Sequence, residues 1–170
     1  MDGQRELHNA YLQAMGITRW VTRQVGEPLD DEPVSEKSAP TPALDWTALE
    51  NQVAGCTRCA LHETRTQTVF GTGNRNADWL IIGEAPGADE DKAGEPFVGR
   101  AGMLLNEMLL AAGYQRDDVY IANILKCRPP DNRNPRPDEV QCCQAYLQRQ
   151  VELLQPRIIL AVGKIAAHSL

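Results

Sequence analysis

Residues 79–105 read WLIIGEAPGADEDKAGEPFVGRAGMLL, an apolar run that passes into a polar loop and then into a second apolar pattern. From Gly83 to Leu105 the stretch holds five glycines, two prolines and five acidic residues. Residues 79–82 are continuously apolar, which is typical of a buried strand, whereas residues 101–113 repeat apolar side chains at helical spacing. The stretch therefore predicts a buried strand that leaves through a long glycine-rich loop and continues into a helix.

The same alternation continues along the chain. Apolar runs typical of strands occupy residues 119–125 and 157–163, and helical patterns occupy residues 46–55, 137–155 and the segment that starts at 164. Continuous apolar strands between helices indicate a parallel sheet with both faces covered. We expect an α/β fold, a three-layer α/β/α sandwich with a parallel central sheet. Such sheets bind ligands outside the carboxyl ends of their strands, so we expect the site at the exits GEAPG, NILKCRPP and AVGK.

The first 45 residues do not follow this pattern. Residues 1–25 contain a short amphipathic segment, and residues 26–45 are rich in proline and acidic side chains, which is typical of a linker. Residues 27–50 hold seven acidic residues and one lysine, so the formal net charge of −6 originates here. The amphipathic segment either packs on the main body or binds another protein.

The overall composition is that of a globular protein, with 42% hydrophobic and 24% charged residues. No apolar run approaches the roughly 18 residues that a membrane-spanning helix requires. The N-terminus lacks the basic start and apolar core of a signal peptide. These features predict a cytoplasmic location, where five cysteines are not expected to form a disulfide framework.

The cysteines instead suggest a metal centre. Cys56 and Cys59 form a C-x2-C pair, a spacing that lets two thiolates reach one centre. Cys127 follows a predicted strand, and Cys142 and Cys143 are neighbours on a predicted helix, where their side chains point about 100° apart. One of these two can therefore face the same centre. Structural zinc and an iron–sulfur cluster both suit four cysteines, and the alternative is that all five pack as small apolar residues.

Three motifs in order resemble the family 4 uracil-DNA glycosylases: CTRCALHETRTQTVFG (56–71), GEAPGADEDKAGEPFVGRAGMLLN (83–106) and YIANILKCRPPDNRNPRPDE (120–139). The resemblance covers roughly residues 48–170 and makes residues 46–170 a uracil-DNA glycosylase-like domain. It implies a DNA-binding hydrolase of DNA repair, which flips uracil out of damaged DNA and hydrolyses its N-glycosidic bond to start base excision repair. It also implies a 4Fe-4S cluster held by Cys56, Cys59, Cys127 and Cys143, with Cys142 left to packing.

The resemblance also implies the residues of a uracil pocket: Glu84, Ala85 and Pro86 along its wall, Phe97 stacked on the base, and Asn123 at the uracil edge. An asparagine amide donates to O4 and accepts from N3–H, a pattern that cytosine does not complement. Glu84 would be catalytic, either orienting the attacking water or stabilising the cationic sugar.

Simpler interpretations exist for each of these residues. Glu84 could be a solvated loop acid, Phe97 ordinary core and Asn123 a backbone cap. We interpret residues 89–91 as a hydrated acidic run without chemistry. The proline-rich loop at 126–136 carries four bases that predict a contact to the DNA backbone, or else a solvated loop: Lys126, Arg128, Arg133 and Arg136.

Two features differ from the family pattern. The family has a fourth strand followed by a His-Pro motif with Leu and Arg, whereas the sequence ends at Leu170 and His168 does not precede a proline. We therefore expect a sheet that stops before its last strand. Either the sequence is a fragment of a longer protein, or the natural protein lost its C-terminus, in which case we expect weak or absent activity. The segment LQAMGITRW also resembles the N-terminal peptide of the psi subunit of DNA polymerase III. That resemblance implies a clamp-loader partner bound through residues 8–24, and an alternative function as a non-catalytic clamp-loader accessory protein.

Overall fold

The structure is a computed structural model, and it describes residues 45–170. The predicted amphipathic segment at 1–25, nearly all of the predicted linker at 26–45 and the proposed clamp-loader contact at 8–24 lie outside the described residues and stay predictions. In the described part, no helix is both long and apolar enough to cross a membrane.

The centre of the domain is a four-stranded sheet in the order β1-β3-β2-β4. Strands β2 (Trp79–Gly83), β3 (Tyr120–Asn123) and β4 (Ile158–Ala161) run parallel, as predicted. Strand β1 (Thr72–Gly73) pairs antiparallel with β3 and was not predicted, because two residues carry no hydrophobic pattern. The parallel sheet predicted from the apolar runs is confirmed, with one short antiparallel strand added at its edge.

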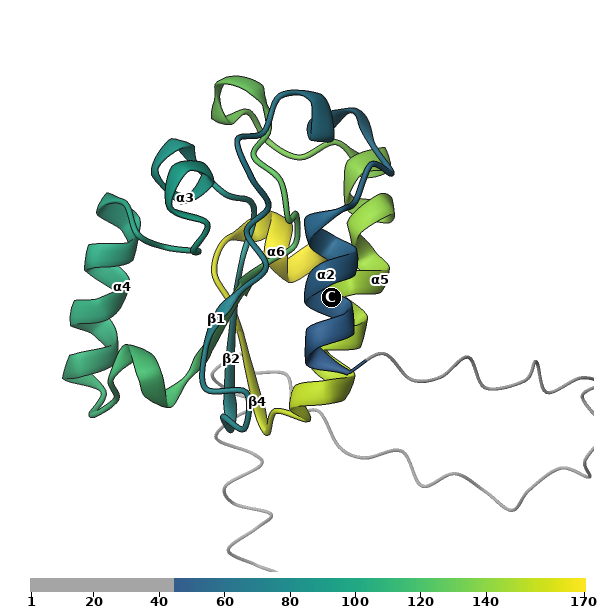
Figure 1. The fold of residues 1–170 in the computed structure, drawn as a ribbon. Helices are drawn as coiled ribbons and strands as arrows, with labels where there is room; N and C mark the ends of the chain where they lie inside the picture. Colours follow the sequence, from purple (N-terminus) through teal and green to yellow (C-terminus); the bar gives the residue numbers. More distant parts are fainter. Residues whose placement is uncertain (1–44) are drawn as a thin grey trace, which may run out of the picture. The chain divides into compact units, whose positions relative to one another are not determined.

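Helices cover both faces of the central strands β2 and β3 (Figure 1), whereas the apolar side chains of β4 at Ile158, Ile159 and Leu160 are exposed. Helices α5 (Pro137–Leu154) and α6 (Lys164–His168) contribute to the core on one face, and α4 (Arg100–Ala111) packs on the other. Helix α2 (Trp46–Ala54) lies beside α5, and the short α3 (Ala88–Ala93) follows β2. Three 3-10 turns are also present within residues 45–170: Ala60–Glu63 (η1), Arg116–Asp118 (η2) and Pro130–Asn132 (η3). The predicted three-layer arrangement is confirmed.

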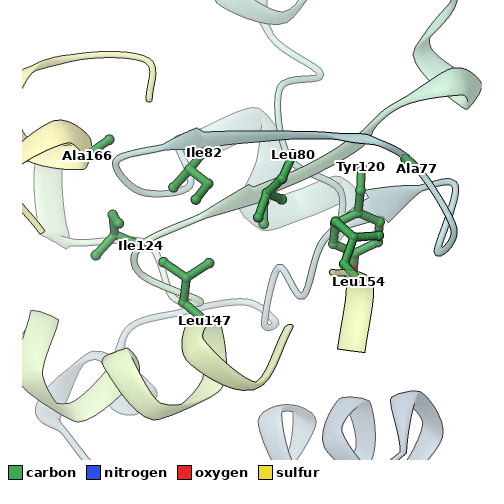
Figure 2. Close-up of a cluster of buried hydrophobic side chains, with 9 residues drawn as sticks. Ala77, Leu80, Ile82, Tyr120, Ile124, Leu147, Leu154 and Ala166 are labelled. Atoms are coloured by element: carbon green, nitrogen blue, oxygen red, sulfur yellow. The ribbon is translucent and has the colours of Figure 1, made fainter. Parts of the chain in front are cut away.

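Side chains alternate between the two faces because successive residues of a strand point in opposite directions. Leu80 and Ile82 of β2 face Leu147 and other apolar residues of α5 in the cluster drawn in Figure 2. Ile81, between them, joins the opposite cluster with two leucines of α4. Both faces of the central strands are therefore buried. The sheet pairing holds the ends of these strands in a fixed register.

Candidate functional site

The carboxyl ends of the three parallel strands meet at one cavity of about 310 Å³. The parallel pairing continues just past the strands, since the Ile124 amide donates to the Gly83 carbonyl at 2.9 Å and the Val162 amide to the Ile82 carbonyl at 2.8 Å. These bonds fix the three chain segments where they leave the sheet. The cavity is lined by Glu84, Ala85, Gly87, Glu90, Phe97, Ala101, Asn123 and Val162.

Four of the five residues predicted for a uracil pocket line this cavity: Glu84, Ala85, Phe97 and Asn123. The fifth, Pro86, is buried next to them and is not one of the lining residues. Asn123 is only 2% exposed, whereas Glu84 and Phe97 are half-buried. The cavity thus combines a carboxylate, an aromatic ring and an amide that come from separate parts of the chain.

Gly83 allows the ring and the amide to approach one another. A Cβ at this position would lie 2.4 Å from Asn123 Oδ1 and 2.6 Å from the Phe97 ring. Both distances are too short for any real side chain, so glycine is required by space rather than by backbone conformation. The end of β2 is therefore shaped to bring Phe97 and Asn123 against the same backbone atom.

Two of the three acids after β2, Glu90 and Asp91, are structural, which corrects their interpretation as hydrated, whereas Asp89 is exposed as expected. Asp91 is 2% exposed and both of its carboxylate oxygens accept the Thr66 amide, at 2.9 and 3.0 Å. Glu90 accepts three backbone amides, those of Gly87, Val98 and Gly99. Burial raises the pKa of Glu90, but these amides outweigh burial and lower it overall. Helical acids that bond to distant backbone cannot be distinguished from solvated acids by composition.

The prediction that Lys126 contacts a DNA phosphate is wrong. Lys126 is 1% exposed, and its Nζ donates to the Asn123 carbonyl at 2.9 Å and to Gln150 Oε1 at 2.6 Å. Burial lowers its pKa to about 7. A lysine that directly follows an apolar strand can remain inside, because Gln150 on α5 reaches it there. This tertiary partner is invisible in the local sequence.

The other three bases of the loop have different environments. Arg133 forms a two-bond pair with Glu139, at 2.9 and 2.5 Å, and Arg128 donates to Asn132 at 2.7 Å. Arg136 is exposed, and its backbone amide donates to Glu139 at the start of α5. Their contact with the DNA backbone stays a prediction, and Arg133 already has a structural partner.

The cysteines of three chain segments converge beside the cavity. Cys127 and Cys143 are each 3% exposed and pack in one cluster with Leu61 and Leu125, against which Cys59 and Ala85 also pack. Since Ala85 lines the cavity, this cluster borders it directly. Arg65 Nη1 donates to Cys127 Sγ at 3.0 Å. Cys127 also interacts electrostatically with both Cys56 and Cys59, so all four predicted ligands lie in one region.

Burial determines the chemistry of these thiols in the protein without metal. It raises the pKa of Cys143 to about 11 and also raises the pKa values of Cys59 and Cys127. Within residues 45–170, no group of three or more His, Cys, Asp or Glu side chains is arranged to hold a metal ion.

Cys142 differs from its neighbour in burial and direction. Its thiol is half-buried and contacts the Arg58 carbonyl oxygen at 3.4 Å, within the C-x2-C segment. Cys143 instead packs with Cys127 in the buried cluster. The two adjacent cysteines thus lie in different environments, and Cys143 is the one on the Cys127 side.

Comparison with known proteins identifies the family. The model described as the uracil DNA glycosylase superfamily matches residues 70–170, which include the cavity and two of the three cysteine segments. The chain belongs to the uracil-DNA glycosylase superfamily. Within it, a type-4 uracil-DNA glycosylase from Archaeoglobus fulgidus is 53% identical over 117 residues, which are 69% of this chain and 59% of the relative. The resemblance to type-4 enzymes predicted from the three motifs is confirmed.

Two further type-4 uracil-DNA glycosylases support the assignment. The protein from Thermotoga maritima is 49% identical over 118 residues, 69% of this chain and 62% of the relative. The protein from Pyrobaculum aerophilum is 47% identical over 127 residues, 75% of this chain and 65% of the relative. The chain spans about three fifths of the length of these curated relatives.

Four residues that line the cavity were not predicted from the sequence: Gly87, Glu90, Ala101 and Val162. Val162 belongs to the AVGK exit of β4, so the rule on strand ends indicated its segment without naming the residue. Glu90 accepts the amide of Gly87 three residues earlier, but its other two partners are backbone amides eight and nine residues further along the chain, which no local pattern indicates.

Proposed function

We propose that this protein excises uracil from DNA. The supporting observation is the cavity at the strand ends, which brings Glu84, Phe97 and Asn123 together in a space suited to a small planar ligand. A base must leave the stack to reach such a site, and an aromatic ring then replaces the stacking it has lost. The sequence identity to type-4 uracil-DNA glycosylases supports uracil as the base that is excised.

Each of the three side chains has a distinct role. Phe97 stacks on the flipped base, and the Asn123 amide pairs with the uracil edge, where cytosine would leave donors and acceptors unmatched. The Glu84 carboxylate stabilises the positive charge that develops on the sugar as the N-glycosidic bond breaks, and it orients the water that attacks. The result is free uracil and an abasic site.

Replacement of the Asn123 amide by a carboxylate tests whether this residue recognises the uracil base. We expect Asn123→Asp to lower the rate of uracil release at least 100-fold, because a carboxylate cannot donate to O4 and a buried unmatched group is costly. Release is measured on oligonucleotides that contain one uracil or one cytosine, with protein in excess so that slow excision is detected. The exposed Asn76→Asp is the matched control and should behave as wild type. An unchanged rate for Asn123→Asp, or no uracil release by the wild-type protein, would refute the proposal.

We propose further that Cys56, Cys59, Cys127 and Cys143 hold a 4Fe-4S cluster. A zinc ion needs four sulfurs about 2.3 Å from one metal, whereas a 4Fe-4S cluster binds each thiolate to a different iron and accepts a wider spacing. Cys127 and Cys143 share one buried cluster, and Cys59 packs against it, which supports a shared metal centre. The resemblance to the type-4 enzymes favours the 4Fe-4S cluster over zinc. When bound, the cluster would serve as a structural tie between the C-x2-C segment, the end of β3 and α5.

The metal content of the purified protein distinguishes a 4Fe-4S cluster from a zinc site. Protein purified without oxygen should be brown, absorb visible light and contain about four irons per chain, as a 4Fe-4S cluster requires. Stoichiometric zinc with a colourless protein would contradict the cluster and favour a zinc site. This result is independent of the excision assay, so either proposal can fail alone.

A further inference from the structure

Phe97 has an unusual backbone conformation for a bulky residue. Its φ is 54°, in the left-handed region, and the other described non-glycine residues with positive φ are Asp131, Asn132 and Gln155. Asp and Asn tolerate this region, and Gln155 ends a helix, where it is common. An aromatic residue persists there only when its surroundings hold it, and Phe97 is the residue whose ring lines the cavity.

Arg116 holds the peptide groups on either side of Phe97 from outside the cavity. Its Nη1 donates to the Phe97 carbonyl at 3.2 Å, and its Nη2 donates to the Pro96 carbonyl. Nη1 also donates to Asn106 Oδ1 at 3.3 Å, which links the guanidinium to α4. A planar guanidinium can hold two successive carbonyls in fixed directions, which an ammonium cannot do.

The following peptide groups are held from the other side. Glu90 Oε1 accepts the amides of Val98 at 3.0 Å and Gly99 at 2.9 Å. The absence of a side chain at Gly102 lets the first turn of α4 lie against the Phe97 carbonyl. Glu90 itself lines the cavity, whereas Arg116 does not. Arg116 is therefore the contact that can be removed without changing the surface that meets a ligand.

We infer that Arg116 is a positioning residue that sets the direction of the Phe97 ring and thereby the strength of base stacking; this rests on the proposed uracil excision. Arg116 fixes the carbonyls before and after the Phe97 Cα, so the ring stays against Gly83 and Asn123. Without the guanidinium, Phe97 relaxes toward negative φ and the ring leaves its place in the cavity.

The position of the ring can be measured without any activity. The chain has two phenylalanines, Phe70 and Phe97, so protein made with 4-fluorophenylalanine gives two fluorine resonances. Phe70 is 6% exposed in a separate core cluster and serves as the internal reference. Phe97→Leu assigns the second resonance. We expect Arg116→Met to shift or broaden the Phe97 resonance and to leave that of Phe70 unchanged. Arg116→Lys, which keeps one donor group, should have a smaller effect.

Two results of this measurement would overturn the inference. An unchanged Phe97 resonance in Arg116→Met would show that the guanidinium does not hold the ring. Equal disturbance of both resonances in Arg116→Met and Arg116→Lys would show that Arg116 supports the whole domain. Arg157→Met is the control, because its side chain is 80% exposed and its ion pair with Asp78 is long, at 3.9 Å.

Excision kinetics then separate this inference from the proposed function. Arg116→Met should lower kcat/KM for uracil release roughly 10-fold or more, the loss expected when one base–aromatic stack is weakened. In the Phe97→Leu background the same substitution should add little, because its effect passes through the ring. Equal losses in both backgrounds would contradict the inference while uracil release by wild type still supports the function. Failure of wild type to release uracil contradicts the function and leaves the fluorine result to decide the role of Arg116.

Discussion

Gln150 is completely buried and bonds to three groups from different parts of the chain. Its Oε1 accepts from Lys126, and its Nε2 donates to the Phe70 carbonyl at 2.9 Å and to Tyr120 Oη at 3.3 Å. Since Lys126 also donates to the Asn123 carbonyl, α5 is tied through two polar side chains to the strand end that carries Asn123. This buried polar network thus supports the end of β3 that carries Asn123.

Gln150→Leu should destabilise the protein by about 2–4 kcal/mol, because it leaves buried partners without their hydrogen bonds. The melting temperature should fall by roughly 5–15 °C for a domain of this size. Gln148→Leu, on the exposed side of the same helix, should change it little. Equal melting temperatures for Gln150→Leu and wild type would mean that the network contributes no stability.

Glu139 gives the stability a defined pH dependence. The hydrogen bonds from Arg133 lower the pKa of this carboxyl below its ordinary value of 4.5. The unfolded chain therefore binds the proton more readily, so the contribution of the pair is fully present above about pH 4.5 and is lost as the pH falls through the folded pKa. We expect the melting temperature of wild type to exceed that of Glu139→Gln at pH 7, and the difference to shrink toward pH 3. A difference that stays constant or grows on acidification would exclude this pair as its source.

Helix α4 begins against the loop that carries Phe97, and its glycine shows how closely the two pack. A Cβ on Gly102 would lie 1.8 Å from the Phe97 carbonyl oxygen. Glycine within a helix is ordinarily less stable than alanine by about 1 kcal/mol. At Gly102 we expect the opposite order, because an alanine Cβ would clash with the Phe97 carbonyl oxygen unless helix α4 or the loop moved.

Gly102→Ala should therefore destabilise the protein by about 1–3 kcal/mol, as overpacking does, and lower the melting temperature. It should also weaken uracil release, since Phe97 must move. Glu107→Ala, an exposed change on the same helix, is the control for helix propensity. A rise in melting temperature for Gly102→Ala would indicate that propensity outweighs the contact and that the loop has room to shift.

The elements that sequence alone predicted are those with a period long enough to recognise. Strands β2, β3 and β4 and helices α2, α4 and α5 each show a continuous apolar run or a helical repeat, and each is present. The helix expected from residue 164 is also present, as α6. Helix α3 and strand β1 were not predicted, since a six-residue helix with four charged residues and a two-residue strand carry no hydrophobic period. Helix α3 depends instead on Glu90 and Asp91, whose carboxylates bond to backbone of other segments.

At the level of the whole molecule, topology explains why the position of the site could be predicted from the sequence while several contacts of its residues could not. Parallel strands bring their carboxyl ends to one edge, so Glu84, Asn123 and the AVGK segment were expected together. The burial of Lys126 and the holding of Phe97 by Arg116 depend on side chains 24 and 19 residues away. Contacts at that separation follow from the packed structure and leave no local pattern, which is why Lys126 was wrongly assigned to DNA.

That these distant cysteines together hold a 4Fe-4S cluster is the central claim about the assembled molecule, and iron bound per chain tests it most directly. Iron and acid-labile sulfide should be measured in wild type, Cys142→Ala and Cys143→Ala, all purified without oxygen. We predict about four irons in wild type and in Cys142→Ala, and a loss of most iron in Cys143→Ala, because Cys143 packs with Cys127 while Cys142 faces the Arg58 carbonyl. Full iron in Cys143→Ala together with loss in Cys142→Ala would contradict the claim, and so would a wild-type protein that binds no iron.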